Sequence, residues 1–202
     1  MPEASAQTER RTLVLDSCRV ETRAEGEPPR IVGHAAVFNQ LSENLGGFRE
    51  TIKPGAFAGA IKSDDVRALF NHNPDFVLGR NRSGTLSLTE DAQGLAIEIT
   101  PPDTQVARDL LISMERGDIN QMSFGFRVKP GGQEWGEGEG GYAVRTLTNL
   151  ALLDVSLVTY PAYPQTDAAV RSLDDYRQHQ QQQHKASLDR HKIRLRMIEK
   201  HI

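Results

Sequence analysis

The sequence predicts a β-rich α+β domain, a closed or nearly closed β-barrel with peripheral helices, followed by a C-terminal helical tail. About eight short segments alternate apolar and polar residues, as strands do. Only two segments before the tail carry a helical pattern, and they do not alternate with the strands as βαβ units would. The 202 residues exceed one domain of about 150 residues, so an extension is expected.

The N-terminal part begins with polar residues 1–11, which are expected to be disordered. Alternation then predicts strands in the segments RTLVLDSCRVETR and RIVGHAAVF, with a turn at EGEPPR between them. Pro54 lies near the first turn of a short predicted helix that Lys53 opens. Residues 66–72 predict a strand that ends at His72, and the following Asn73-Pro74 pair marks a turn.

A hairpin and a helix are the clearest local patterns. Alternating leucines and isoleucines predict the hairpin over residues 86–99, with its turn at EDAQG. An apolar stripe of period 3.6 predicts the helix over residues 101–117. Asp103 is its expected N-cap, and Gly117 is expected to end it.

Three more strands are predicted over 119–128, 142–148 and 150–159. The glycine-rich acidic segment GGQEWGEGEGG is expected to be a mobile loop after the first of them. In the first strand, alternation places Ser123 opposite the large apolar side chains. In the last strand, strict alternation places the single carboxylate, Asp154, on one face with Leu150, Leu152, Ser156 and Val158.

The charge divides the chain into two parts. Residues 171–202 hold 8 Lys/Arg and 4 Asp/Glu, a net charge of +4, and subtraction from the totals of 24 and 27 leaves −7 for residues 1–170. We therefore predict a domain over 12–170 and, over 171–202, a Gln-rich linker with a basic amphipathic helix. The acidic domain lacks the clustered Lys/Arg that specific nucleic-acid binding requires. The tail is interpreted as a solvated helix, a polyanion contact, or an amphipathic helix that binds a partner or docks on the core.

Several classes of protein are excluded. The only cysteine, Cys18, rules out disulfide scaffolding and is interpreted as a small buried hydrophobe. No apolar run approaches the roughly 20 residues of a membrane span. The N-terminus carries no secretory signal pattern, so a reducing cytoplasm is expected. The metal-ligand motifs C-x-x-C and H-E-x-x-H are absent from the sequence, and so are the glycine-rich phosphate-binding motifs.

A serine nucleophile would need a histidine base and a third group that orients the base. The domain holds only two histidines. His34 lies inside a strand among small apolar residues, which favours a core role, whereas His72 ends a strand beside a turn. Ser123 has Gly125 beside it, which leaves space for a substrate backbone. Asp154 is costly among apolar residues unless it is paired or solvated. The local sequence pattern also allows a purely structural role for each of these residues.

Six segments together resemble one family, the HK97-type tailed-phage prohead serine proteases, over about residues 31–171. In chain order they are GHAAVFN, GGFRETIKPGAFAGAI, DVRALFNHNPDFVLGR, SGTLSLTEDAQGLAIEI, ERGDINQMSFGFRV and LLDVSLVTYPAYPQT. The resemblance implies a β-barrel fold like that of herpesvirus assemblin. It also implies that His72 is the general base, Ser123 the nucleophile and Asp154 the third member, with no cofactor.

The resemblance implies a serine endopeptidase that acts in the host cytoplasm within the viral procapsid. Its expected substrates are the major capsid protein or its scaffold segment, and the protease itself by autocleavage. Self-association is a further expectation, whereas membrane and specific nucleic-acid partners are not expected. Two alternatives stay open: a noncatalytic capsid assembly module on the same fold, and a small β-barrel binding domain with an oligomerisation tail.

Overall fold

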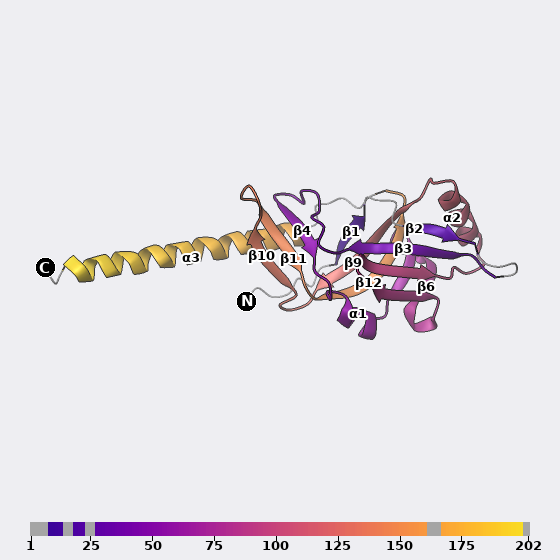
Figure 1. Cartoon of the computed structure of the whole chain (residues 1–202), viewed down its shortest axis with the longest axis horizontal. Coiled ribbons are helices and arrows are strands. Elements are labelled where there is room, and N and C mark those ends of the chain that lie inside the picture. Colours follow the sequence, from indigo (N-terminus) through magenta and orange to yellow (C-terminus); the bar gives the residue numbers. More distant parts are fainter. Residues whose placement is uncertain (1–7, 14–17, 23–26, 161–166, 200–202) are drawn as a thin grey trace.

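The computed structural model describes residues 8–13, 18–22, 27–160 and 167–199, and its strands form three sheets (Figure 1). The five-stranded sheet contains, in spatial order, β1 (Glu9–Leu13), β9 (Gln121–Val128), β12 (Leu150–Val158), β5 (Arg67–Phe70) and β6 (Asn73–Arg80). The four-stranded sheet contains β2 (Cys18–Glu21), β3 (Arg30–Val37), β8 (Gly94–Ile99) and β7 (Leu86–Glu90). The three-stranded sheet contains β10 (Gln133–Glu137), β11 (Ala143–Leu147) and β4 (Phe48–Ile52). The helical elements are α1 (Ala58–Ser63), the 3-10 turn η1 (Asn81–Ser83), α2 (Gln105–Glu115) and α3 (Asp167–Glu199).

The strand pairing confirms the β-rich class but corrects the predicted barrel. Among the described residues, the ladders end at β1 and β6 in one sheet and at β2 and β7 in another, so no closed barrel is shown. Apolar alternation specifies only which face of a strand is buried. Packed sheets satisfy that requirement as well as a barrel does, so the sequence pattern cannot select between them.

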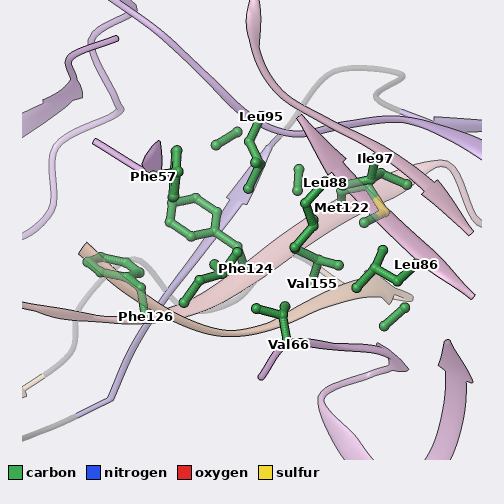
Figure 2. Packing of buried hydrophobic residues seen from close by; sticks show 14 of the residues in the cluster. Phe57, Val66, Leu86, Leu88, Leu95, Ile97, Met122, Phe124, Phe126 and Val155 are labelled. Carbon is green, nitrogen blue, oxygen red and sulfur yellow. The ribbon is translucent and has the colours of Figure 1, made fainter. Parts of the chain in front are cut away.

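The main core lies between the five-stranded and four-stranded sheets. Side chains of β7 and β8 point toward those of β9 and β12 across this layer (Figure 2). Phe57, just before α1, packs its ring edge against Phe124 of β9, with 5.6 Å between ring centroids. The apolar face of β9 is therefore fully engaged in the core, which holds the opposite face of the strand in place.

Two predicted elements are confirmed with small changes. The hairpin over residues 86–99 is β7 and β8, and the helix is α2. Its N-cap is Thr104 rather than Asp103, because the Thr104 side chain accepts a hydrogen bond from the Ala107 amide at 3.3 Å. The Asp103 carboxylate instead pairs with Arg108. Gly117 follows the helix with a φ of 81°, the left-handed conformation that glycine adopts most easily.

Three strands, β4, β6 and β10, escaped prediction, and β1 was predicted only in part. β6 contains Pro74, which a strand tolerates at the edge of a sheet, where β6 lies. β10 is polar and lies inside the segment predicted as a mobile loop, where it pairs with β11. β1 begins at Glu9, inside the segment predicted to be disordered, because the Glu9 carboxylate is buried among arginine side chains.

The tail is a single long helix, α3, that extends away from the sheets (Figure 1). Its first turns belong to the body, since Leu173 is buried against Leu45 and Phe48. Tyr176 stacks on Trp135 of β10, with ring centroids 5.1 Å apart. The predicted boundary at residue 171 therefore precedes the last residues that pack on the sheets. No helix among the described residues is long and apolar enough to cross a membrane.

Candidate active site

The site is built on the neighbouring antiparallel strands β9 and β12. Ser123 on β9 pairs with Ser156 on β12, and Gly125 pairs with Asp154. Directly paired residues project from the same face of a sheet. All four residues therefore lie on the face of β9 that is turned away from the main core.

A β-bulge in β12 decides the direction of Asp154. The register shifts between Leu152 and Asp154, so that two steps on β12 match one step on β9. Leu152 pairs with Phe126 in the core, whereas Asp154 lies on the opposite face of the sheet. Strict alternation had placed Asp154 with Leu150 and Leu152. That placement is wrong because the extra residue reverses the alternation.

Gly125 makes room for the Asp154 carboxylate. A Cβ at position 125 would lie 2.4 Å from Asp154 Oδ2, closer than two nonbonded atoms approach. A residue with a side chain at this position would therefore displace the carboxylate.

His72 reaches these strands from the tight turn between β5 and β6. Phe70 pairs with Asn73, which leaves Asn71 and His72 as a two-residue hairpin loop. Both have a φ of 54°, as the type I′ hairpin turn requires. The turn predicted at Asn73-Pro74 is thus displaced by two residues, because asparagine tolerates positive φ whereas Pro74 continues into the edge strand.

Asn71 ties this turn to the end of β12. The side-chain nitrogen Nδ2 of Asn71 donates to Thr159 Oγ1 at 3.1 Å, and the side-chain oxygen Oδ1 accepts from the Thr159 backbone N–H at 2.9 Å. Its backbone N–H donates to the Leu157 carbonyl at 2.8 Å. These bonds hold the His72 backbone beside the strand that carries Asp154.

The structure brings His72, Ser123 and Asp154 into one hydrogen-bonded chain. His72 Nε2 lies 2.7 Å from Ser123 Oγ, and His72 Nδ1 lies 2.6 Å from Asp154 Oδ1. An ionised carboxylate only accepts hydrogen bonds, so Nδ1 is the donor to Asp154. In a neutral imidazole, Nε2 is then free to accept the Ser123 proton. This is the arrangement that nucleophilic acyl transfer needs.

The three side chains are almost withdrawn from solvent. Ser123 is completely buried, and the His72 side chain is 6% exposed. Burial strengthens the electrostatic interactions within the chain of bonds.

The other residues considered from the sequence lie elsewhere. His34 belongs to β3 in the four-stranded sheet, and its Nε2 lies 2.8 Å from Asp91 Oδ2 in the hairpin turn. The Gly94 amide, and then His34, lower the pKa of Asp91 to about 2. Cys18 is half-buried and packs against the main core. In the described parts of the chain, no group of three or more acidic, histidine or cysteine residues is arranged to hold a metal ion.

Asn71 and Ser156 are contacts of the site that sequence reasoning missed. Asn71 precedes His72, and an asparagine beside a histidine is a signal for a positive-φ turn. Ser156 is separated from Asp154 by one residue, which places both on one face of a strand. Its importance follows only from the register of β12 against β9.

Comparison with known proteins found a matching family and a solved structure of similar fold. The family described as Caudovirus prohead serine protease matches residues 17–181. Among solved structures, the fold is similar to that of the capsid assembly protease of bacteriophage T4, with a TM-score of 0.50 and 11% sequence identity. That likeness covers 77% of this chain and 98% of the phage T4 chain, and at this identity it concerns the fold alone. A search of curated proteins found no match.

Proposed function

The chain belongs to the caudovirus prohead serine protease family, and from that premise we propose that it is an endopeptidase with the triad Ser123, His72 and Asp154. The observation that supports this most strongly is the chain of short hydrogen bonds through the His72 ring. One ring nitrogen lies 2.7 Å from the Ser123 hydroxyl, and the other lies 2.6 Å from a carboxylate.

The proposed reaction is acyl transfer to Ser123. His72 Nε2 takes the Ser123 proton as Oγ forms a bond to the scissile carbonyl carbon, and the protonated His72 then gives a proton to the leaving amine. The carbonyl carbon remains on Oγ as an acyl-enzyme, which water hydrolyses with His72 again acting as the base. Asp154 holds the Nδ1–H tautomer and stabilises the imidazolium that forms during each half-reaction.

The proposed substrates are the major capsid protein or its scaffold segment, and the protease itself, cleaved inside the procapsid in the host cell. Membership in the prohead protease family supports this, and the solved structure of similar fold is that of a capsid assembly protease. The projecting part of α3 is the surface that we propose for contact with scaffold or capsid subunits.

The test is to coexpress the capsid protein with the wild-type chain, with Ser123→Ala or with Ser87→Ala, and to measure the fragment masses. Ser87 is an exposed serine on β7, and it serves as the matched control. We expect defined fragments from the wild type and from Ser87→Ala. We expect an uncut capsid protein with Ser123→Ala, because alanine has no hydroxyl to act as the nucleophile. Normal processing by Ser123→Ala would instead support a noncatalytic assembly module. Assembled particles are the right setting, because the burial of Ser123 predicts slow reaction in the free chain.

A further inference from the structure

Ser156 carries a buried hydroxyl next to the proposed triad. The proposed reaction does not use this hydroxyl. It lies on β12 directly across from Ser123, and it is completely buried. Its Oγ donates a hydrogen bond to Asp154 Oδ1 at 2.6 Å. A buried hydroxyl loses its contact with water and therefore needs a partner of its own, and here that partner is the triad carboxylate.

The same carboxylate oxygen receives two donors. His72 Nδ1 and Ser156 Oγ each lie 2.6 Å from Asp154 Oδ1. Hydrogen bonds to an ionised acceptor are short and strong. The Ser156 bond also limits rotation of the carboxylate, which otherwise has only the His72 ring to orient it.

Resting on the proposed function, we propose that Ser156 is a positioning residue for catalysis, which holds the Asp154 carboxylate aimed at His72 Nδ1. Ser156 does not touch the reacting atoms; it acts on the orientation of the base through Asp154. Three features of the fold serve this role. The bulge turns Asp154 to this face, Gly125 leaves its carboxylate space, and the pairing with Ser123 places Ser156 beside the site.

The role predicts an effect on the chemical step rather than on substrate binding. Removing one hydrogen bond to the charged carboxylate is expected to lower kcat by about 10-fold to 100-fold. KM should stay within about twofold, because Ser156 is buried behind the triad and a peptide does not contact it. A merely structural serine would change the amount of folded protein and leave kcat of the folded fraction unchanged.

The experiment compares Ser156→Thr with Ser156→Val in the full-length chain. The two side chains have nearly the same shape, and only threonine carries a hydroxyl, so any packing strain is shared. We expect Thr to keep most of the wild-type kcat on a capsid-derived peptide, and Val to lose about 10-fold to 100-fold at similar KM. Thermal unfolding of each variant verifies that the two fold equally. Equal kcat for Thr and Val would overturn the proposal.

A second readout needs no substrate. The proton between His72 Nδ1 and Asp154 Oδ1 is expected to give a downfield proton NMR signal, identified by its loss in His72→Ala. It should shift in Ser156→Val and stay near its wild-type position in Ser156→Thr. An unchanged signal in the Val variant would overturn the positioning role. If no protein substrate is ever cut while this signal responds as expected, the proposed function fails, and only the contact by which Ser156 orients Asp154 toward His72 stands.

Discussion

At the scale of single residues, the site depends on Gly125, because this residue has no side chain. Asp154 can lie over β9 only because position 125 has no Cβ, and its carboxylate is then fixed by His72 and Ser156. Ordinarily, a flexible aspartate would move away from an added methyl group at little cost. Here that movement would break both hydrogen bonds, so the cost falls on the proposed triad rather than on the fold.

Gly125→Ala is therefore expected to separate activity from stability. Its methyl group would lie 2.4 Å from Asp154 Oδ2 and displace the carboxylate. We expect cleavage of the capsid protein to fall by about 10²-fold to 10⁴-fold, as when a triad histidine loses its orienting group. Chemical unfolding should show a loss of no more than about 3 kcal/mol.

The matched control is Gly136→Ala on β10, where an added Cβ meets nothing within 4 Å. It should keep wild-type activity. Wild-type activity in Gly125→Ala would show that Asp154 is not needed at its present position.

At the scale of elements, α3 combines two different environments. Its first turns are anchored, since Leu173 is 1% exposed and Tyr176 stacks on Trp135. Every described side chain from Arg177 to Leu188 is exposed. A helix that is polar on all sides gains little from packing on its own body, so its projecting part is available for contact with another molecule.

A chain that ends at Gln181 is expected to fold and to lose only the proposed contact with scaffold or capsid subunits. Its thermal midpoint should match the wild type, because the anchoring side chains are kept. Its copy number inside procapsids, measured by quantitative mass spectrometry, should fall at least about tenfold. Leu173→Ala serves as the comparison, since a buried leucine truncated to alanine costs about 2–5 kcal/mol of folding free energy. Packaging of the shortened chain at the wild-type level would disprove the contact.

At the scale of the whole molecule, a buried cluster of charges joins two sheets. Arg145 of β11 is completely buried and donates to Glu9 of β1 at 2.8 and 2.9 Å, and to Glu50 of β4 at 3.0 Å. Arg11 donates to Glu9 and Glu50 at 2.8 Å each. Gln133 accepts from Arg145 and donates to Ser172 at the start of α3. β1, which borders the strand of Ser123, is thereby tied to the sheet that holds the tail.

This cluster predicts a loss of stability in acid. Burial alone raises the pKa of Glu9, but the hydrogen bond from Arg145 and the charges of both arginines outweigh it, so the folded pKa lies below the ordinary 4.5. As the pH falls, Glu9 therefore takes up a proton at a higher pH in the unfolded chain than in the folded chain. The stabilisation is present above about pH 4.5 and is lost as the pH falls through the folded pKa.

Glu9→Gln tests this origin of the acid sensitivity. It should lower the free energy of unfolding at pH 7 by about 3–5 kcal/mol, because the buried Arg145 and Arg11 lose the charged carboxylate that accepts from both of them. Below pH 4.5, urea titrations should show a flatter pH dependence than in the wild type. Glu134→Gln, which alters an exposed pair with Lys53, is the control and should change stability by less than about 1 kcal/mol. Asp65, whose pKa the Arg80 hydrogen bond lowers to about 2, contributes equally in all variants. Parallel curves for Glu9→Gln and wild type would contradict the prediction.

Much of the secondary structure and of the candidate site could be predicted from the sequence. The hairpin, helix α2 and strands β3, β9, β11 and β12 follow from apolar periodicity, which reports burial within one element. The segments FNHNP, MSFGF and LLDVSLVT pointed to His72, Ser123 and Asp154 through a family resemblance. β4, β6, β10 and the start of β1 were missed because they are short, polar or interrupted by proline. β1 and β4 pair with strands far away in the chain.

The sequence by itself determined the family, the apolar faces and the residue types at the site. Only the tertiary structure decided the bulge that turns Asp154, the positive-φ turn that presents His72, and the pairing that brings Ser156 to the carboxylate. The bulge and the Ser156 pairing depend on the register of β12 against β9, and the turn depends on the register of β5 against β6. Periodicity within one strand carries no information on that register, because any partner with a matching apolar face would satisfy it. The division into three sheets and the buried charges that connect them were decided by packing for the same reason.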